Sequence, residues 1–287
     1  RCAAMLKAPL ESFGEFGTLR VLSKRVRVDF AVSSKEVYPQ PAALPKVSAA
    51  PLELDLLRRD FTINAMAVAI GPSGIGRLID PSRGLEDLRK RRLRVLHPGS
   101  FRDDPTRVFR AARFLCRFNL KPAPGLLALA CAALDAGHAL RLSRHRLAQE
   151  LLRILAEKDP ACALSRLKTW GYLDLIHPEL SLPAALGSTV EERLGGIVLA
   201  MGDKGAELLR SLPIARVTAA SIEEALKLSA APASPKNPLS PLAAKLVSRV
   251  FAQLPSAALG PATLTGEDIQ ALGIEPGPRY RVILDAA

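Results

Sequence analysis

The sequence has no run of eighteen or more apolar residues, although 48% of its 287 residues are hydrophobic. A membrane-spanning helix needs about 20 consecutive apolar residues, so we predict none here. No basic segment followed by an apolar run and small residues opens the chain, and we therefore expect no secretion and a cytoplasmic location.

Cysteine and histidine are scarce, with four of each. The cysteines Cys2, Cys116, Cys131 and Cys162 form no C-x-x-C pair, and no histidine stands at a metal-ligand spacing. We therefore predict neither a structural zinc site nor a disulfide framework. A reducing compartment fits this cysteine content best. Cys116 is expected to pack inside a helix.

Aromatic residues make up only 5% of the chain, which argues against a single-strand binder built on stacked rings. Acidic residues are outnumbered, because 28 Asp and Glu face 40 Lys and Arg, and the net charge is +12. This surplus favours a polyanionic partner, nucleic acid before membrane. A solvated basic surface without a partner is the alternative.

The first 70 residues are typical of a mixed α/β region. Alternating apolar residues predict short strands at 19–22 and 26–32. A proline- and alanine-rich segment at 38–51 predicts a loop, and helical periodicity follows at 52–70.

Most segments after residue 100 are predicted to be helical, after a turn at 79–84 and a basic helical turn at 85–92. A segment rich in proline and serine at 229–241 is the clearest linker. The fold class is therefore α+β, a small mixed sheet followed by a helical body. The helices are expected at 105–118, 125–136, 143–157, 160–170, 190–201, 203–211, 220–228 and 240–253.

One group of chemistry-bearing residues lies within the helix expected over 52–70. Asp60 and Asn64 are four residues apart, so a helix would place them on one face. A carboxylate beside a carboxamide suits a ribose, and Arg59 could reach a phosphate. The alternative is a helix capped by Asp60 with its arginines in solvent.

A second group begins where Asp104 precedes Pro105, a combination that starts a helix firmly. The arginines that follow repel one another unless an anion or a carboxylate neutralises them. The opposite side is apolar, so we expect them to face a cleft or solvent. They are Arg107, Arg110, Arg113 and Arg117.

Two weaker signals remain. Arg146 and Glu150 are four residues apart and follow a plausible N-cap, Ser143. Arginine and glutamate at this spacing most often form an ion pair that stabilises the helix. Asp29 is an acid within an otherwise apolar strand, and one carboxylate alone is a poor centre for metal-dependent nucleotidyl transfer.

Three motifs, in this order and at this spacing, closely resemble the bacterial class II tRNA nucleotidyltransferase and poly(A) polymerase family. They are RRDFTINAMA (58–67), LIDPSRGLEDLRKRRLRVL (78–96) and SFRDDPTRVFRAARF (100–114). The resemblance extends to GEFGTLRV (14–21), VDFAVSSKEVY (28–38), LSRHRLAQEL (142–151) and LTGEDIQALGIEPGP (264–278), and is loosest between about 180 and 260.

The resemblance implies how a nucleotide would be bound. Arg59, Asp60 and Asn64 match the segment that recognises the ribose and phosphates, while Asp104 and Arg107 match the pair that selects the base through hydrogen bonds. It also implies that Arg110 and Arg113 contact the nucleotide or its phosphates.

Other positions match supporting parts of the family. Asp80 and Gly84 match the hinge between head and neck, and Arg146 and Glu150 match a motif that supports the base-reading helix. The implied organisation is a partial nucleotidyltransferase head (1–70), a neck with the base-recognition helix (71–120), a helical body (121–180) and a helical, tRNA-binding tail (181–287).

The sequence departs from the family in its head. The family carries a glycine pair and a strand with two metal-binding aspartates, D-x-D, before its match to residues 14–21, and nothing comparable precedes Phe13. We therefore predict a chain trimmed at both ends, without metal ligands and inactive as given. Asp29 stands where relatives often have a third head-domain acid, and Ser34 where many have Arg.

The function implied by the resemblance is the addition of CMP and/or AMP to the 3′ end of tRNA without a nucleic-acid template, with ATP and/or CTP as substrates and Mg²⁺ as the cofactor. A poly(A) polymerase of the same family shares every motif quoted above. A noncatalytic RNA- or nucleotide-binding paralogue is a further alternative.

Overall fold

The computed structural model describes residues 2–13, 18–24, 26–183, 186–230 and 239–253. Over these residues the predicted α+β class is confirmed. The matched motif at the C-terminal end of the sequence and most of the predicted linker lie outside the described residues. The chain divides into two compact units: unit 1 is 1–180 with 211–213, and unit 2 is 181–210 with 214–287. The four-part division implied by the resemblance stays a prediction.

An antiparallel three-stranded sheet follows the short helix α1 (Cys2–Leu6) at the start of unit 1. The strands predicted at 19–22 and 26–32 are confirmed as its second and third members, and the first is an addition. In order across the sheet they are β1 (Leu10–Phe13), β2 (Thr18–Leu22) and β3 (Arg27–Phe30).

A second hairpin shows that the loop predicted over 38–51 is wrong in part. It is formed by β4 (Ser34–Val37) and β5 (Lys46–Ala49). The prolines that suggested a loop, Pro45 and Pro51, lie just outside β5, where neither removes a hydrogen bond between the strands.

The helix predicted over 52–70 is wrong after Leu57. Helix α2 spans Leu52–Leu57, and a single 3₁₀ turn, η1, follows at Thr62–Asn64. Between them the backbone of Phe61 is extended and forms an isolated β-bridge with Val95. Pairing with a distant segment here overrides the local helical periodicity.

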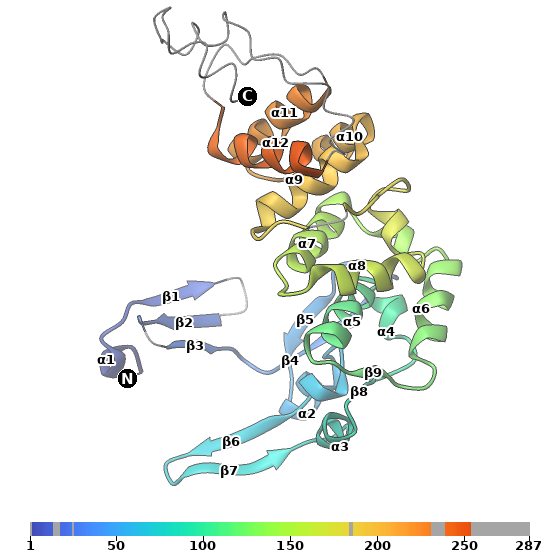
Figure 1. The fold of residues 1–287 in the computed structure, drawn as a ribbon. Coiled ribbons are helices and arrows are strands. Elements are labelled where there is room, and N and C mark those ends of the chain that lie inside the picture. Colours follow the sequence, from blue (N-terminus) through green and yellow to red (C-terminus); the bar gives the residue numbers. More distant parts are fainter. Residues whose placement is uncertain (1, 14–17, 25, 184–185, 231–238, 254–287) are drawn as a thin grey trace, which may run out of the picture. The chain divides into compact units, whose positions relative to one another are not determined.

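The remainder of that stretch enters a hairpin of β6 (Ala67–Gly71) and β7 (Gly74–Ile79), the long two-stranded ribbon in Figure 1. Helix α3 (Gly84–Arg89) follows, as the helical turn predicted at 85–92 anticipates.

The start of α3 is fixed by two contacts. The carboxylate of Asp80 accepts hydrogen bonds from the backbone N–H groups of Gly84 (2.7 Å) and Leu85 (2.9 Å). A Cβ on Gly84 would stand 2.1 Å from the carbonyl oxygen of Thr62, so the close approach of α3 to η1 requires glycine.

The core of unit 1 lies among helices, and the four that the sequence predicts between 105 and 170 are confirmed. Helix α5 packs against α7 and α8. The rings of Phe109 and Tyr172, both fully buried, meet edge to face at 5.8 Å, and the Tyr172 hydroxyl donates to the carbonyl oxygen of Ala130. The helices are α4 (Ser100–Asp103), α5 (Thr106–Arg117), α6 (Leu126–Asp135), α7 (Arg144–Leu155) and α8 (Pro160–Thr169).

Short elements connect these helices. Strands β8 (Arg92–Leu93) and β9 (Lys121–Pro122) pair in parallel, and the 3₁₀ turns η2 (Ala139–Arg141) and η3 (Leu173–Leu175) precede α7 and follow α8.

A disulfide between Cys116 and Cys162 joins α5 to α8. The prediction of unpaired cysteines is therefore wrong for these two, and Cys116 does more than pack. The two residues are 46 positions apart, and only the packing of α5 on α8 brings them together, so no sequence spacing indicates the bond.

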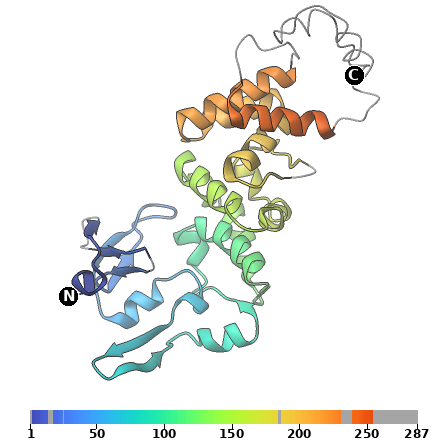
Figure 2. The same ribbon diagram turned by 60° about the vertical axis from the view of Figure 1, so that its left-hand side comes forward.

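Helices make up the described part of unit 2. Three lie where predicted, to within one residue, and α11 is longer than the predicted 220–228. Helices α9, α11 and α12 lie side by side (Figures 1 and 2). Within the described ranges, no helix of either unit is long and apolar enough to cross a membrane. The helices are α9 (Val190–Met201), α10 (Asp203–Ser211), α11 (Arg216–Ala230) and α12 (Pro241–Gln253).

Candidate functional site

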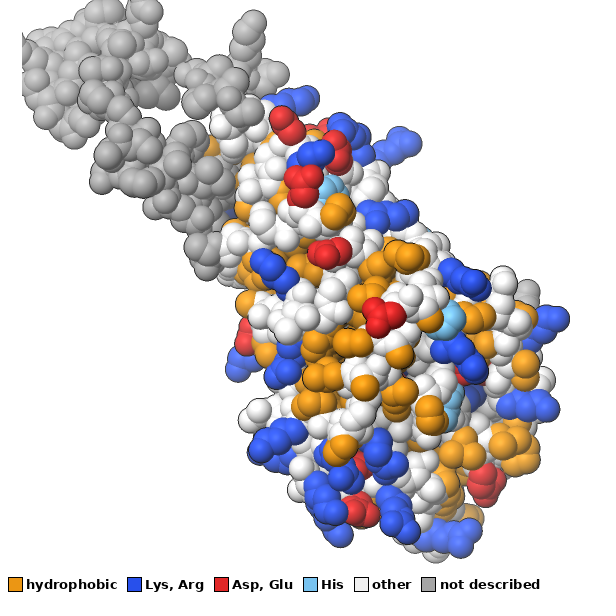
Figure 3. All heavy atoms as spheres, turned by 90° about the vertical axis from the view of Figure 1, so that its right-hand side faces the viewer, with side chains coloured by type: hydrophobic (Ala, Val, Ile, Leu, Met, Phe, Trp, Pro, Cys, Tyr) orange, Lys and Arg blue, Asp and Glu red, His pale blue; other side chains and the backbone are white. Residues whose placement is uncertain are grey.

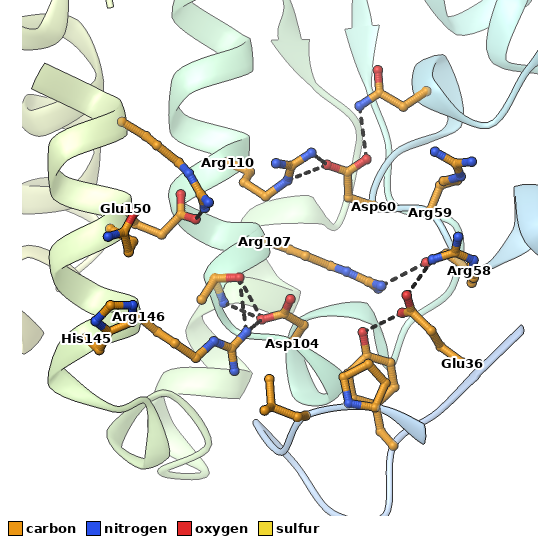
Figure 4. Close-up of a pocket in the computed structure, with 17 residues that line it drawn as sticks. Glu36, Arg58, Arg59, Asp60, Asp104, Arg107, Arg110, His145, Arg146 and Glu150 are labelled. Carbon is orange, nitrogen blue, oxygen red and sulfur yellow. Dashed lines mark hydrogen bonds and ion pairs between the residues drawn. The ribbon is translucent and has the colours of Figure 1, made fainter. Parts of the chain in front are cut away.

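A cavity of about 780 Å³ in unit 1 collects most of the residues that the sequence singles out. It is lined by residues of β4, of the segment between α2 and η1, of α5 and of α7 (Figure 4). Its charged lining has an excess of arginine over carboxylate. The arginines are Arg58, Arg59, Arg107, Arg110, Arg146 and Arg153, and the carboxylates are Glu36, Asp60, Asp104 and Glu150.

Asp60 and Asn64 meet in this cavity, as the sequence predicts, although no α-helix carries them. The Oδ1 of Asp60 accepts hydrogen bonds from the side-chain amide of Asn64 and from the Phe61 N–H, both at 2.9 Å. Its Oδ2 accepts from Arg110 Nε at 2.6 Å, and Asp60 is only 8% exposed. The acid therefore ties η1 to α5 and directs the amide toward the cavity.

Arg58 and Arg59 are held by one buried acid, Asp55, which also accepts from the Ser34 N–H. Burial would raise the pKa of Asp55, but hydrogen bonds from both arginines outweigh it and lower the pKa. Arg58 also forms an ion pair with Glu36, whereas Arg59, which lines the cavity, has 46% of its side chain exposed. Arg59 therefore keeps donors available to a ligand.

Asp104 lies at the start of α5 with only one of its two oxygens engaged. Its Oδ1 accepts from the Thr106 N–H (3.0 Å), the Thr106 hydroxyl (2.7 Å) and Arg146 Nη2 (2.6 Å). Within the described part of the chain no donor is assigned to Oδ2. The carboxylate is thus fixed in orientation with an acceptor still available.

Arg107 is a buried cation, 5% exposed, for which no carboxylate ion pair is found among the described residues. Its Nη1 donates to the Ser100 hydroxyl and its Nη2 to the carbonyl oxygen of Arg58, both at 2.9 Å. The guanidinium lies 6.0 Å from the centroid of the Tyr38 ring. Because both acceptors are neutral, its charge is available to attract a ligand in the cavity.

The arginines of α5 divide into two groups. Arg107 and Arg110 line the cavity, but Arg113 and Arg117 do not. The last two donate to Glu157, which lies just before α8, at 2.8 and 2.9 Å. Carboxylates therefore neutralise three of the four arginines, all but Arg107, and Arg113 is buried rather than facing a cleft or solvent.

Helix α7 contributes Arg146 to the cavity. The predicted N-cap is confirmed, because the Ser143 hydroxyl accepts from the Arg146 N–H. The expected ion pair between Arg146 and Glu150 is wrong: Arg146 turns to Asp104, whereas Glu150 pairs with Arg153. Arg146 therefore pairs outside α7, and Glu150 pairs with its i+3 neighbour on the same helix, in place of the i,i+4 pair that the spacing suggests.

Asp29 is not among the residues that line the cavity. On β3 it is paired with Arg20 and Arg27, each at 2.7 Å. Hydrogen bonds from Arg20 and then from Arg27 hold the pKa of Asp29 well below its usual range.

Sequence reasoning misses the contribution of β4 and of Tyr38, the residue directly after it. Glu36 and Tyr38 both line the cavity, and the Tyr38 hydroxyl donates to Glu36 at 2.8 Å. Positions i and i+2 of a strand lie on the same face, so an E-x-Y pattern in a recognised strand would have indicated this pair.

The lining carboxylates do not fit a magnesium site. Mg²⁺ is held by oxygen ligands that include carboxylates free to coordinate it. Glu36, Asp60 and Asp104 are each in an ion pair with an arginine, and the described residues contain no group of three or more His, Cys, Asp and Glu side chains that could hold a metal.

Comparison with known proteins gives consistent matches. The family described as poly A polymerase head domain matches residues 3–94. The A-adding tRNA nucleotidyltransferase of Geobacter sulfurreducens is 41% identical over 174 residues, covering 60% of this chain and 20% of that protein. The CC-adding tRNA nucleotidyltransferase of Deinococcus radiodurans is 36% identical over 258 residues, covering 87% of this chain and 64% of that protein.

A solved structure of a CCA-adding enzyme without ligand aligns with a TM-score of 0.68 at 25% identity, covering 99% of this chain and 78% of that one. These matches show that the chain is similar to tRNA nucleotidyltransferases in sequence and to a CCA-adding enzyme in fold. Its similarity is to the bacterial class II tRNA nucleotidyltransferase and poly(A) polymerase family, with the head-domain family match over residues 3–94. The chain spans less than two thirds of the length of each of these two relatives.

Proposed function

We propose that this chain selects and holds the incoming nucleotide of a tRNA nucleotidyltransferase that adds CMP and/or AMP to the 3′ end of tRNA without a nucleic-acid template. The observation that carries the proposal is the pairing of Asp104 and Arg107 in one cavity, one offering an unengaged carboxylate oxygen and the other a buried guanidinium. The relatives named for A and CC addition support it.

The two side chains suit cytosine and adenine equally. Each of these bases presents an amino group, which donates, beside a ring nitrogen, which accepts. A carboxylate can only accept and a guanidinium can only donate, so Asp104 would take the amino group and Arg107 the ring nitrogen. Guanine and uracil present a carbonyl beside a ring N–H. Their carbonyl oxygen would face the Asp104 carboxylate, which also accepts, and their N–H would face the Arg107 guanidinium, which also donates.

The remaining cavity residues would hold the sugar and phosphates. The Asn64 side chain has a carbonyl oxygen besides the amide bonded to Asp60, and suits a ribose hydroxyl. Arg59, with its exposed guanidinium, suits the triphosphate. We assign Arg110 to orienting Asp60, and Arg113, Arg146 and Glu150 to supporting α5 and Asp104.

The reaction proposed for the whole protein is attack by the tRNA 3′-hydroxyl oxygen on the α-phosphorus, which forms a phosphodiester and releases pyrophosphate. Mg²⁺ belongs to the proposal as a cofactor of the family, but the lining carboxylates of this chain do not fit it. The same misfit favours, as the second candidate, a noncatalytic nucleotide-binding role.

A change at Asp104 should alter base selection. We expect the wild-type chain to bind ATP or CTP more tightly than GTP and UTP, and Asp104→Asn to reduce that preference about 10- to 100-fold, since a hydrogen bond to a charged group contributes about 1.5–3 kcal/mol. Calorimetric titration with the four nucleotides measures this. Asp103→Asn is the matched control, because Asp103 pairs with Arg102 and does not line the cavity. Unchanged selectivity in Asp104→Asn would remove the base-reading assignment.

Transfer activity tests whether this chain completes the reaction by itself. Incubation of the 287-residue chain with Mg²⁺, ATP, CTP and tRNAs ending before CCA, after C and after CC should leave the tRNAs unextended, because the lining carboxylates do not fit a metal. Gel sizing of the RNA is the measurement. Extension by C, C and A, by a single A, or by a long A tail would instead define a CCA-adding enzyme, an A-adding enzyme or a poly(A) polymerase.

A further inference from the structure

A second, smaller cavity of unit 1 lies at α3 and β8, outside the lining of the nucleotide cavity. Its volume is about 540 Å³, and its charged lining is Arg83, Arg92 and Arg94 against Glu86. The surrounding sequence is strongly basic, with six Lys and Arg against two acids between residues 83 and 94. Figure 3 shows Lys and Arg side chains gathered at the lower end of the visible face, at the height at which Figure 1 draws α3.

Two of these arginines are anchored by one buried carboxylate. Asp87 is fully buried and accepts from Arg92 Nε at 2.7 Å and Arg94 Nε at 2.8 Å. Arg94 Nη2 also donates to the carbonyl oxygen of Ser82. Their bonds leave Nη1 of each without an assigned acceptor within the described part of the chain. Because 31% and 39% of their side chains are exposed, these groups can reach a ligand.

Arg83 completes the cluster from the other side. It stands directly before α3 with φ of 57°, the left-handed conformation. Its carbonyl oxygen accepts from the Asp87 N–H, but within the described part of the chain its guanidinium has no assigned hydrogen bond or salt bridge. Gly84, pressed against the Thr62 carbonyl, fixes the backbone at this point. Three guanidinium groups therefore share one cavity around a single buried acid, and their excess charge calls for an external anion.

We infer that this cavity binds backbone phosphates of the RNA substrate, an inference that rests on the proposed function. Guanidinium forks suit the tetrahedral oxygens of a phosphodiester, and a site without aromatic platforms would hold RNA by its backbone rather than its bases. The hydroxyl of Thr62, in η1, donates to Asp87 at 2.7 Å. The cavity is therefore built on the same segment that carries Asp60 and Asn64.

The test is RNA binding by the 287-residue chain carrying Arg83→Asn. Asparagine tolerates the left-handed conformation, and the change leaves Asp87 with both of its arginines. Loss of one phosphate contact should weaken the binding of a tRNA lacking CCA about eightfold at 0.1 M salt, and reduce the slope of log K against log salt by about 1. Fluorescence anisotropy across a salt series measures both quantities.

The matched control is Arg77→Asn, which removes the same charge from an exposed arginine of β7 outside both cavities. An equal loss in both variants would indicate general surface attraction and overturn the site. ATP or CTP affinity should be unchanged in Arg83→Asn. If wild type binds neither nucleotide nor tRNA, the proposed function fails as well, whereas normal tRNA binding by Arg83→Asn overturns this inference alone.

Inorganic pyrophosphate distinguishes a small anion from RNA as the occupant. Calorimetric titration of wild type and Arg83→Asn with pyrophosphate should show no more than weak binding, while tRNA binding differs between them. Pyrophosphate binding that depends on Arg83, together with unchanged tRNA affinity, would replace the RNA backbone with a free phosphate as the ligand.

Discussion

Replacing Glu157 with alanine is expected to lower the free energy of unfolding of unit 1 by about 3–5 kcal/mol, the cost of leaving a buried charge without its partner. The Glu157 side chain is 8% exposed and accepts from Arg113 and Arg117 of α5. Without it, Arg113, 9% exposed, would keep only the longer approach of Glu150 at 3.6 Å. Urea unfolding followed by the fluorescence of Trp170, the single tryptophan of the chain, reports on this unit.

Two further variants show whether burial is the cause. Glu86→Ala removes a carboxylate that is 44% exposed and paired with Lys90 one helical turn away, and should cost no more than about 0.5 kcal/mol. Glu157→Gln keeps a hydrogen-bond acceptor for the arginines, so its loss in free energy of unfolding should lie between those of the two alanine variants. Equal losses in Glu157→Ala and Glu86→Ala would contradict a buried, coupled network.

The same carboxylate makes stability depend on pH. Burial would raise the pKa of Glu157, but the hydrogen bonds from Arg117 and Arg113 outweigh it and lower the pKa from its ordinary 4.5. A lowered pKa means that the folded state binds the proton less readily than the unfolded state. The stabilisation is therefore present above about pH 4.5 and is lost as the pH falls through the folded pKa, a loss that Glu157→Gln should reduce.

Local signals predict α5 well because they are read within one helix. Asp104 followed by Pro105 marks its start, and an apolar face with arginines opposite marks its course. Its ion-pair partners are not local: Arg113 and Glu157 are 44 residues apart, and Arg146 and Asp104 are 42 apart. Such pairs depend on how helices pack, which one sequence does not specify.

The sequence predicts which residues line the cavity better than it predicts the secondary structure that carries them. Helical spacing predicts that Asp60 and Asn64 meet, and they do, but through an extended residue and a 3₁₀ turn. The bridge from Phe61 to Val95 displaces the helix, and no local pattern encodes it. The roles in nucleotide binding come from the family resemblance, and they stay predictions.

Helix α5 connects the stability of unit 1 to the arginine-lined cavity. Its first turn carries Arg107, its middle carries Arg113, and its last turn carries Cys116. Anything that loosens the far end of α5 can therefore move the end that carries Arg107. The disulfide to α8 is the covalent part of that restraint.

Removing the bond between Cys116 and Cys162 should lower the stability of unit 1 by about 4 kcal/mol, the chain-entropy value for closing a loop of this length. The separation is 46 residues, and the effect arises mainly because the reduced unfolded chain regains freedom. Urea unfolding followed by Trp170 fluorescence, with and without dithiothreitol, measures the difference. Nucleotide affinity should fall in parallel if α5 transmits the restraint.

Two variants make the result decisive. Cys131→Ser removes an exposed free cysteine and should change stability by no more than about 0.5 kcal/mol. The double variant Cys116→Ser/Cys162→Ser should already have the lower stability and should not respond to dithiothreitol, because the bond that the reductant breaks is gone. Thiol labelling of the denatured, unreduced protein, followed by peptide mapping, should leave Cys116 and Cys162 unlabelled, whereas labelling of both would show that α5 and α8 are held by packing and ion pairs alone.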